Sequence, residues 1–234
     1  MEGEDVKLLG LWASPFVMRV RIALNLKGVK YTYSEENLKA KSELLLKFNP
    51  VYKKVPVLIH EGKPLCESLV IMQYIDEVWA ASGPAILPTN PYDRAIHRFW
   101  AVYLDDKWLS AAREIITLQA KTEEATAAAI VRMQTGLELL EEVFDKCSKG
   151  KSFFGGDSIE YLDIALGSSL SWIKVMELLT GAKIMDENKT PLLVRWGEKF
   201  CAHDAVKGVM TDVEKLLEYA NGLQAFYRNA LPAQ

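Results

Sequence analysis

The sequence predicts a two-domain α+β protein, with strands and helices mixed in the first domain and helices alone in the second. About the first eighty residues alternate short apolar runs with helical periodicity, whereas helical periodicity alone continues beyond about residue 92. The segment "GPAILPTNPY", with three prolines, separates the mixed part of the sequence from the helical part. We therefore expect a first domain at 1–83, a linker at 84–92 and a second domain at 93–234.

The first third of the chain contains a strand-helix-strand unit. The apolar run "VKLLGL" at 6–11 suits a buried strand, and "YTYSEE" at 31–36, with aromatic side chains at alternate positions, suits another. Between them, Ser14 is a typical N-cap, Pro15 stands at the first helical position, and Gly28 ends the apolar periodicity. The sequence therefore predicts a helix from Pro15 to just before Gly28.

A second unit follows, in which two strands precede a helix. The strands are expected to pair in a hairpin around Glu61-Gly62, and Ser68 is expected to cap the helix. The predicted elements are a short helix within 41–49, strands at 55–60 and 63–67, and a helix at 68–82. The order β-α-β followed by β-β-α is typical of a thioredoxin-like domain.

Pro56 lies inside an otherwise strand-like run, which is unusual because proline cannot donate a hydrogen bond to a sheet. A cis Val55-Pro56 bond would turn the chain and present the backbone groups of Val55 outward. Only ~5% of X-Pro bonds in folded proteins are cis, so the sequence leaves both isomers open.

The second domain is predicted to be all-helical. Its amphipathic stretches lie at 93–119, 124–147, 161–181, 191–206 and 212–231.

The composition excludes several classes of function. With 28 basic and 31 acidic residues the net charge is −3, so no overall field attracts nucleic acid or an anionic membrane. Apolar runs are too short to span a membrane, and the acidic start does not resemble a signal peptide, so we expect a cytoplasmic protein. Three cysteines and three histidines are scattered without ligand spacing, which predicts neither disulfides nor a metal site.

Four segments carry a resemblance to a known family. "WASPFVMRVRIALNLKGVKY", "NPVYKKVPVLIHEGKPLCESLVIMQYIDE", "RFWAVYLDDK" and "FFGGDSIEYLDIAL" resemble the plant tau class of glutathione S-transferases, in the same order and spacing over nearly the whole chain. The resemblance implies a glutathione site on the thioredoxin-like domain, a site for hydrophobic electrophiles between the domains, and a homodimer. It also implies detoxification by conjugation, with glutathione-dependent hydroperoxide reduction as a related activity.

The resemblance assigns Ser14 to the activation of glutathione. A thiol has a pKa near ~8.5, so the nucleophilic thiolate is scarce at neutral pH unless the enzyme stabilises it. A serine hydroxyl at a helix start can donate to the sulfur, where helix amides and the dipole also favour negative charge. Lowering the thiol pKa by ~2 units requires about 2.7 kcal/mol. Thiol oxidoreductases and the cysteine-using transferases place cysteine where "ASPF" stands, so serine disfavours both.

Glutathione carries two carboxylates and one ammonium, and the resemblance provides a partner for each. Lys41 and Lys54 would bind the glycyl carboxylate, and the Val55 backbone would pair with the cysteinyl unit. Ser68 would bind the γ-glutamyl carboxylate and Glu67 the ammonium. Taken singly, each also fits a surface charge, a first-turn acid or a plain helix cap.

The expected electrophile pocket rests on aromatic and apolar side chains that also fit a helical core. Leu109 stands where family members have tyrosine, so the pocket lacks that hydroxyl and an altered substrate preference is expected. The expected lining residues are Trp12, Phe16, Trp108, Leu109, Arg113 and Trp172.

The motif "GGDSIEYLDIAL" resembles the family's capped helix start, with an aspartate three residues after the cap. Glu160 occupies the cap position, where the family has glycine or serine. Glutamate is a poor N-cap, so we expect a cost in stability at this helix and no loss of catalysis.

Two alternative functions remain open at this point. One is a ligandin-like carrier that holds hydrophobic ligands or glutathione conjugates without turnover. The other is a structural domain whose thiol site has decayed, although the complete glutathione set argues against decay. For the homodimer, Glu77 with Arg94 or Arg98 is the candidate intersubunit pair.

Overall fold

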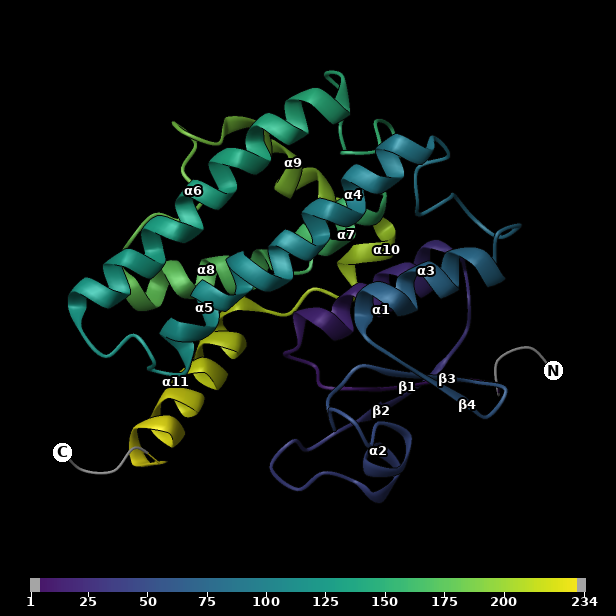
Figure 1. Cartoon of the computed structure of the whole chain (residues 1–234), viewed down its shortest axis with the longest axis horizontal. Coiled ribbons are helices and arrows are strands. Elements are labelled where there is room, and N and C mark those ends of the chain that lie inside the picture. Colours follow the sequence, from purple (N-terminus) through teal and green to yellow (C-terminus); the bar gives the residue numbers. More distant parts are fainter. Residues whose placement is uncertain (1–4, 231–234) are drawn as a thin grey trace.

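A mixed four-stranded sheet forms the centre of the first domain in the computed structural model, which describes residues 5–230 (Figure 1). The strand order is β2-β1-β3-β4, with β1 parallel to β2 and antiparallel to β3, and β3 antiparallel to β4. The strands are β1 (Val6–Gly10), β2 (Thr32–Glu35), β3 (Val57–His60) and β4 (Lys63–Cys66). The predicted thioredoxin-like order is confirmed.

Helices cover both faces of this sheet. Because successive side chains of a strand point to opposite faces, Leu8 packs toward α1 (Pro15–Leu26) and α3 (Ser68–Val78), and Leu9 packs toward α2 (Glu43–Phe48). In Figure 1, α1 and α3 lie between the sheet and the helical part of the chain, and α2 lies on the far side. Helix α1 is therefore buried on most of its circumference.

The rest of the chain is helical, as expected, but three predicted helices are broken. A π-helical segment interrupts 93–119, Ser168 and Ser169 interrupt 161–181, and His203 interrupts 191–206. The helices are α4 (Pro91–Tyr103), the π-helix η1 (Leu104–Trp108), α5 (Leu109–Ile116), α6 (Glu123–Ser148), α7 (Tyr161–Gly167), α8 (Leu170–Thr180), α9 (Pro191–Ala202), α10 (Asp204–Lys207) and α11 (Val213–Ala230).

These breaks escaped prediction because apolar periodicity continues across them. At His203 the backbone is extended (φ −70°, ψ 139°), and the ring Nδ1 accepts a hydrogen bond from the Ala205 N–H, which starts α10. Such a local cap is visible only once the backbone path is known.

The start of α3 also differs from the prediction. Ser68 is the first helical residue and not the N-cap, which is Glu67 at φ 70°. The Ser68 hydroxyl is turned inward, where it accepts a hydrogen bond from Arg19. The expected hairpin turn is confirmed, with positive φ at Glu61 and Gly62, and the Val55-Pro56 peptide bond is cis.

Within residues 5–230, no helix is long and apolar enough to cross a membrane.

The start of α7 is organised by a buried carboxylate. Asp163 is fully buried and accepts hydrogen bonds from the Phe154 N–H (2.9 Å), the Glu160 N–H (2.9 Å) and Trp196 Nε1 (2.7 Å). Glu160 Oε2 lies 3.7 Å from His97 Nδ1. Burial, together with Asp163 and nearby acids, raises the pKa of Glu160 to about 7. The cost that we expect at this position would therefore come from a buried carboxyl group.

We expect Glu160→Gly to raise the melting temperature, by an amount that depends on pH. The stabilising contribution of protonated Glu160 is complete below its ordinary pKa of 4.5 and is lost as the pH rises through about 7. The difference in free energy of unfolding between wild type and Glu160→Gln should therefore change with pH. Wild type should lose ~2 kcal/mol relative to Glu160→Gln between about pH 5 and about pH 8.

Thermal unfolding of wild type, Glu160→Gly and Glu160→Gln across this range checks the prediction. An unchanged or lower melting temperature for Glu160→Gly at the alkaline end would contradict it.

Candidate functional site

The register of the sheet brings the predicted glutathione-binding segments to one end of the domain. Leu9 pairs with Val57 and Val57 pairs with Cys66, so the loop after β1, the loop before β3 and the start of α3 are adjacent. The parallel pairing of Gly10 with Glu35 brings the segment after β2 to the same end. Ser14, Lys41, Val55 and Glu67 all belong to these four segments.

Ser14 is the N-cap of α1, as predicted. Its backbone is extended (φ −83°, ψ 120°), and its Oγ accepts a hydrogen bond from the Val17 N–H at 3.4 Å. A hydroxyl that accepts in this way keeps its own proton free to donate. The start of α1 therefore combines a free O–H donor with the positive end of a helix dipole.

The helical part of the chain holds the loop that leads to Ser14. Trp172 Nε1 on α8 donates to the Ala13 carbonyl at 2.8 Å, and Thr211 Oγ1 donates to the Trp12 carbonyl at 3.0 Å. The position of Ser14 thus depends on residues about 160 to 200 positions later in the sequence.

The second helix start of the site is that of α3. Glu67 is exposed and has a left-handed backbone that non-glycine residues rarely adopt, and such strain clusters at functional sites. Ser68 is buried, and its Oγ accepts a hydrogen bond from Arg19 Nη1 at 3.3 Å. Its hydroxyl proton, like that of Ser14, makes no hydrogen bond within residues 5–230.

Arg19 links this helix start to the helical part of the chain. Its side chain is 0% exposed and forms a two-pronged ion pair with Asp105 of η1, at 2.7 and 3.0 Å. It also donates twice to the Ala165 carbonyl in α7, at 3.1 and 3.3 Å. With the bond to Ser68, all five N–H donors of the guanidinium are used.

Lys41 and Lys54 are exposed beside this end of the sheet. Asn49 Nδ2 donates to the Lys54 carbonyl at 2.9 Å, which fixes the backbone next to Val55. The Lys54 ammonium lies 5.9 Å from the centre of the Tyr52 ring and forms no ion pair within residues 5–230. Both cations are therefore available to an anionic ligand.

Five of the six predicted electrophile-pocket residues line one cavity of about 170 Å³ next to the start of α1. Trp12 does not line it. Its ring instead packs against Tyr219 at 5.4 Å and beneath the Lys215 ammonium at 4.6 Å. The predicted residues that line the cavity are Phe16, Trp108, Leu109, Arg113 and Trp172, and the further ones are Pro15, Ala112, Ile116, Met133, Met176 and Leu223.

Some of these additional residues had a signal in the sequence. Ala112 and Ile116 lie one turn from the predicted pocket residues of α5, so helical spacing from Leu109 and Arg113 would have found them. Arg19 and Leu223 had no such signal, because only tertiary contacts bring α1 and α11 to their partners.

No group of three or more histidine, cysteine, aspartate or glutamate side chains between residues 5 and 230 could hold a metal ion. Cys66, Cys147 and Cys201 are free, and burial raises the pKa of each thiol, the opposite of what a reactive cysteine requires.

Comparison with known proteins agrees with this geometry. Residues 4–77 match the family described as "Glutathione S-transferase, N-terminal domain". Glutathione S-transferase U18 of Arabidopsis thaliana is 56% identical over 223 residues, 95% of this chain and 97% of that protein.

Two solved structures extend the comparison. A tau class glutathione S-transferase from mango, Mangifera indica, superimposes with a TM-score of 0.90 and 55% identity, over 94% of this chain and 98% of that one. Rice GST1 in complex with glutathione superimposes with a TM-score of 0.86 and 35% identity, over 96% and 100% of the two chains.

A thioredoxin-like domain followed by a helical remainder, in a chain with these relatives, defines a glutathione-dependent transferase. The chain belongs to the glutathione S-transferase family, in its tau class.

We expect Arg19→Lys to lower the free energy of unfolding by about 3 kcal/mol. Lysine cannot reproduce the two-pronged bond to Asp105, so a partly buried carboxylate and the Ala165 carbonyl lose partners. The Michaelis constant for glutathione should rise as well, because Ser68 loses its anchor. Arg21→Lys on the same helix, where the side chain donates to the Tyr31 hydroxyl and lies over the Tyr33 ring, is the matched control.

Urea unfolding and steady-state kinetics measure both effects. Equal stability of the Arg19 and Arg21 variants would show that the buried ion pair does not hold the two parts of the chain together.

Proposed function

We propose that this transferase adds the thiolate of glutathione to hydrophobic electrophiles, with Ser14 stabilising the thiolate. The observation that carries the proposal is the position of Ser14, whose free hydroxyl lies at a helix start beside the largely apolar cavity of α1, α5 and α8. The rice relative that was solved with glutathione supports glutathione as the co-substrate.

The energetics are within reach of this arrangement. One hydrogen bond from Ser14 to a charged sulfur, together with the helix dipole, can supply the ~2.7 kcal/mol that a two-unit drop in the thiol pKa requires. No protein base is needed, because the thiol proton can leave to water once the anion is stabilised.

The remaining glutathione contacts follow from the two helix starts and the exposed cations. We assign the glycyl carboxylate to Lys41 and Lys54, the cysteinyl backbone to Val55, the γ-glutamyl carboxylate to Ser68 and its ammonium to Glu67. Arg19 supports this assignment because its hydrogen bond to the Ser68 oxygen leaves the Ser68 proton to point at the ligand.

The shape and charge of the electrophile cavity favour small or flat apolar substrates. Arg113 is the only charged residue among those that line it, and Leu109 contributes no hydroxyl. The same thiolate would reduce an organic hydroperoxide by attacking its terminal oxygen. That step releases an alcohol and leaves a sulfenic acid, which a second glutathione converts to glutathione disulfide and water.

Domain boundaries and location complete the proposal. We take 1–83 as the glutathione-binding domain, 84–92 as the linker and 93–234 as the helical domain that completes the electrophile site. Three free thiols fit the reducing cytoplasm.

We propose the homodimer from exposed apolar side chains on α3 and α4. These two helices are linked by a hydrogen bond from Arg98 of α4 to Gln73 Oε1 of α3, at 2.9 Å. Tyr92 and Phe99 are 72% and 60% exposed, and Val70 on α3 is 52% exposed. Arg98 is therefore engaged within one chain, as is Arg94, which donates to the Pro88 and Thr89 carbonyls. The exposed apolar side chains are thus better candidates for the contact between subunits than an ion pair of either arginine with Glu77.

We expect Ser14→Ala to lower the rate of glutathione addition to 1-chloro-2,4-dinitrobenzene by about 100-fold or more while binding to immobilised glutathione is retained. Thr122→Ala is the control, because it removes the N-cap of α6 at a residue that does not line the electrophile cavity, and it should leave the rate unchanged.

Equal rates for Ser14→Ala and wild type would show that a group other than Ser14 activates the thiol. If wild type forms no product yet releases a bound fluorescent apolar dye when ligand is added, the carrier function would replace the enzymatic one.

For the dimer, light scattering should give twice the mass of one chain for wild type and the mass of one chain for Phe99→Asp. Val131→Asp, at a similarly exposed position on α6, should remain dimeric. A monomeric wild type would remove the dimer proposal.

A further inference from the structure

A second cavity lies away from the glutathione site, between the segment before α4, α4 itself, the end of α6 and the loop before α7. Its volume is about 580 Å³, within the range of about 300–1,000 Å³ of small-molecule sites. None of the residues assigned to glutathione or to the electrophile lines it.

The inner end of this cavity holds a polar atom that lacks a partner. His97 is 2% exposed, and its Nδ1 has no hydrogen-bond partner, with Glu160 Oε2 at 3.7 Å as the nearby polar group. Lys27 Nζ is the other such atom among the described residues, but it lies 2.8 Å from Asp76 Oδ1 and so is ion-paired. A buried nitrogen without a partner is costly, and a ligand would supply one.

The chemistry of this inner end favours a neutral hydroxyl group. Burial lowers the pKa of His97 to about 4, so its ring is uncharged at neutral pH. A neutral imidazole has one donor and one acceptor nitrogen, and a hydroxyl can pair with either. An anion is disfavoured here, because burial penalises a charged group and the neutral ring offers no opposite charge.

The walls of the cavity favour a flat apolar body. Trp100 is half-buried and Phe154 buried, and both line the cavity together with the aliphatic side chains of Ile96 and Val143. This composition suits one aromatic ring.

The outer rim carries an excess of positive charge. Lys146, Lys149 and Lys151 line it, against the single exposed carboxylate of Asp93. Lys146 and Lys151 have carboxylate partners on the surface, whereas Lys149 has none between residues 5 and 230. The rim therefore favours an anionic group at the end of the ligand that faces solvent.

From this gradient of burial and charge we propose that the cavity binds a hydroxylated aromatic carboxylate. The hydroxyl pairs with His97 and Glu160, the ring packs against Trp100, and the carboxylate meets Lys149.

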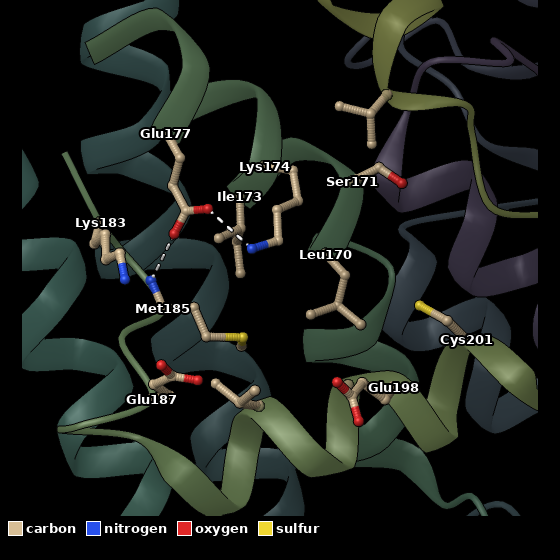
Figure 2. A pocket seen from close by; sticks show the side chains of 13 residues that line it. Leu170, Ser171, Ile173, Lys174, Glu177, Lys183, Met185, Glu187, Glu198 and Cys201 are labelled. Carbon is tan, nitrogen blue, oxygen red and sulfur yellow. Dashed lines mark hydrogen bonds and ion pairs between the residues drawn. The ribbon is translucent and has the colours of Figure 1, made fainter. Parts of the chain in front are cut away.

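A third cavity, between α8 and α9, shows what distinguishes this one (Figure 2). It is about 490 Å³, but its central carboxylate is already satisfied. Glu177 pairs with Lys174 at 3.0 Å and accepts hydrogen bonds from the Ile184 and Met185 N–H groups, each at 3.0 Å. That cavity is lined by no buried polar atom that lacks a partner, and its residues provide the control variants.

The test is calorimetric titration of the full chain with 4-hydroxycinnamate while S-hexylglutathione saturates the active site. Cinnamate, which lacks only the hydroxyl, is the matched ligand. We expect 4-hydroxycinnamate to bind and cinnamate to bind about tenfold more weakly, because one buried hydrogen bond is lost. No binding of 4-hydroxycinnamate, or equal binding of the two, overturns the proposal.

Variants assign the binding to this cavity. His97→Ala should weaken 4-hydroxycinnamate about tenfold and His97→Gln, which keeps a polar atom, less so. Lys149→Gln should weaken it, whereas Lys183→Gln in the cavity of Figure 2 should not. Conjugation of 1-chloro-2,4-dinitrobenzene verifies that each variant is folded. Binding that is insensitive to both His97→Ala and Lys149→Gln overturns the proposal.

A measurement on the unmodified protein covers the case in which a His97 variant fails to fold. Cys147 lines the proposed cavity and Cys201 lines the cavity of Figure 2. With S-hexylglutathione present, 4-hydroxycinnamate should slow alkylation of Cys147 by N-ethylmaleimide and leave that of Cys201 unchanged, as followed by mass spectrometry. Equal effects on both thiols, or none on Cys147, overturn the proposal.

Discussion

The buried guanidinium of Arg19 is the interaction on which the arrangement of the two parts of this chain depends. Its five N–H donors join α1 to α3, η1 and α7 without leaving a donor unsatisfied. A buried cation is tolerated only when it is paired and fully hydrogen-bonded, so Ser68, Asp105 and Ala165 are held in fixed positions relative to α1. The same contacts hold Ser14 in place, because Ser14 caps the helix that carries Arg19.

The proposed catalytic chemistry relies on helix starts. Ser14 and Ser68 each accept one hydrogen bond within the protein, at two helix starts that the sheet register brings to one end of the domain. In the proposed mechanism their hydroxyl protons are donated to glutathione. The apolar cavity beside Ser14 would then place an electrophile next to the sulfur.

The region around Glu160 is a different case, in which we expect a buried polar group to lower stability locally. Asp163 accepts a hydrogen bond from the Glu160 N–H as part of a capping box, and the Glu160 carboxyl group is largely buried near His97. Burial shifts the pKa of both side chains toward their neutral forms. Two neutral polar groups in the lining of a cavity are suited to a ligand hydroxyl, which is the function that we propose for this arrangement.

The sequence by itself determined the order of strands and helices of the first domain, the cap at Ser14 and the hairpin at Glu61-Gly62, because these follow from local periodicity and turn chemistry. Only the tertiary structure decided the partners of Arg19, which lie 49 to 146 residues away, the inward turn of Ser68 and the displacement of Trp12 from the electrophile cavity. Local patterns specify which face of an element is apolar, whereas the meeting of distant faces depends on packing of the whole chain.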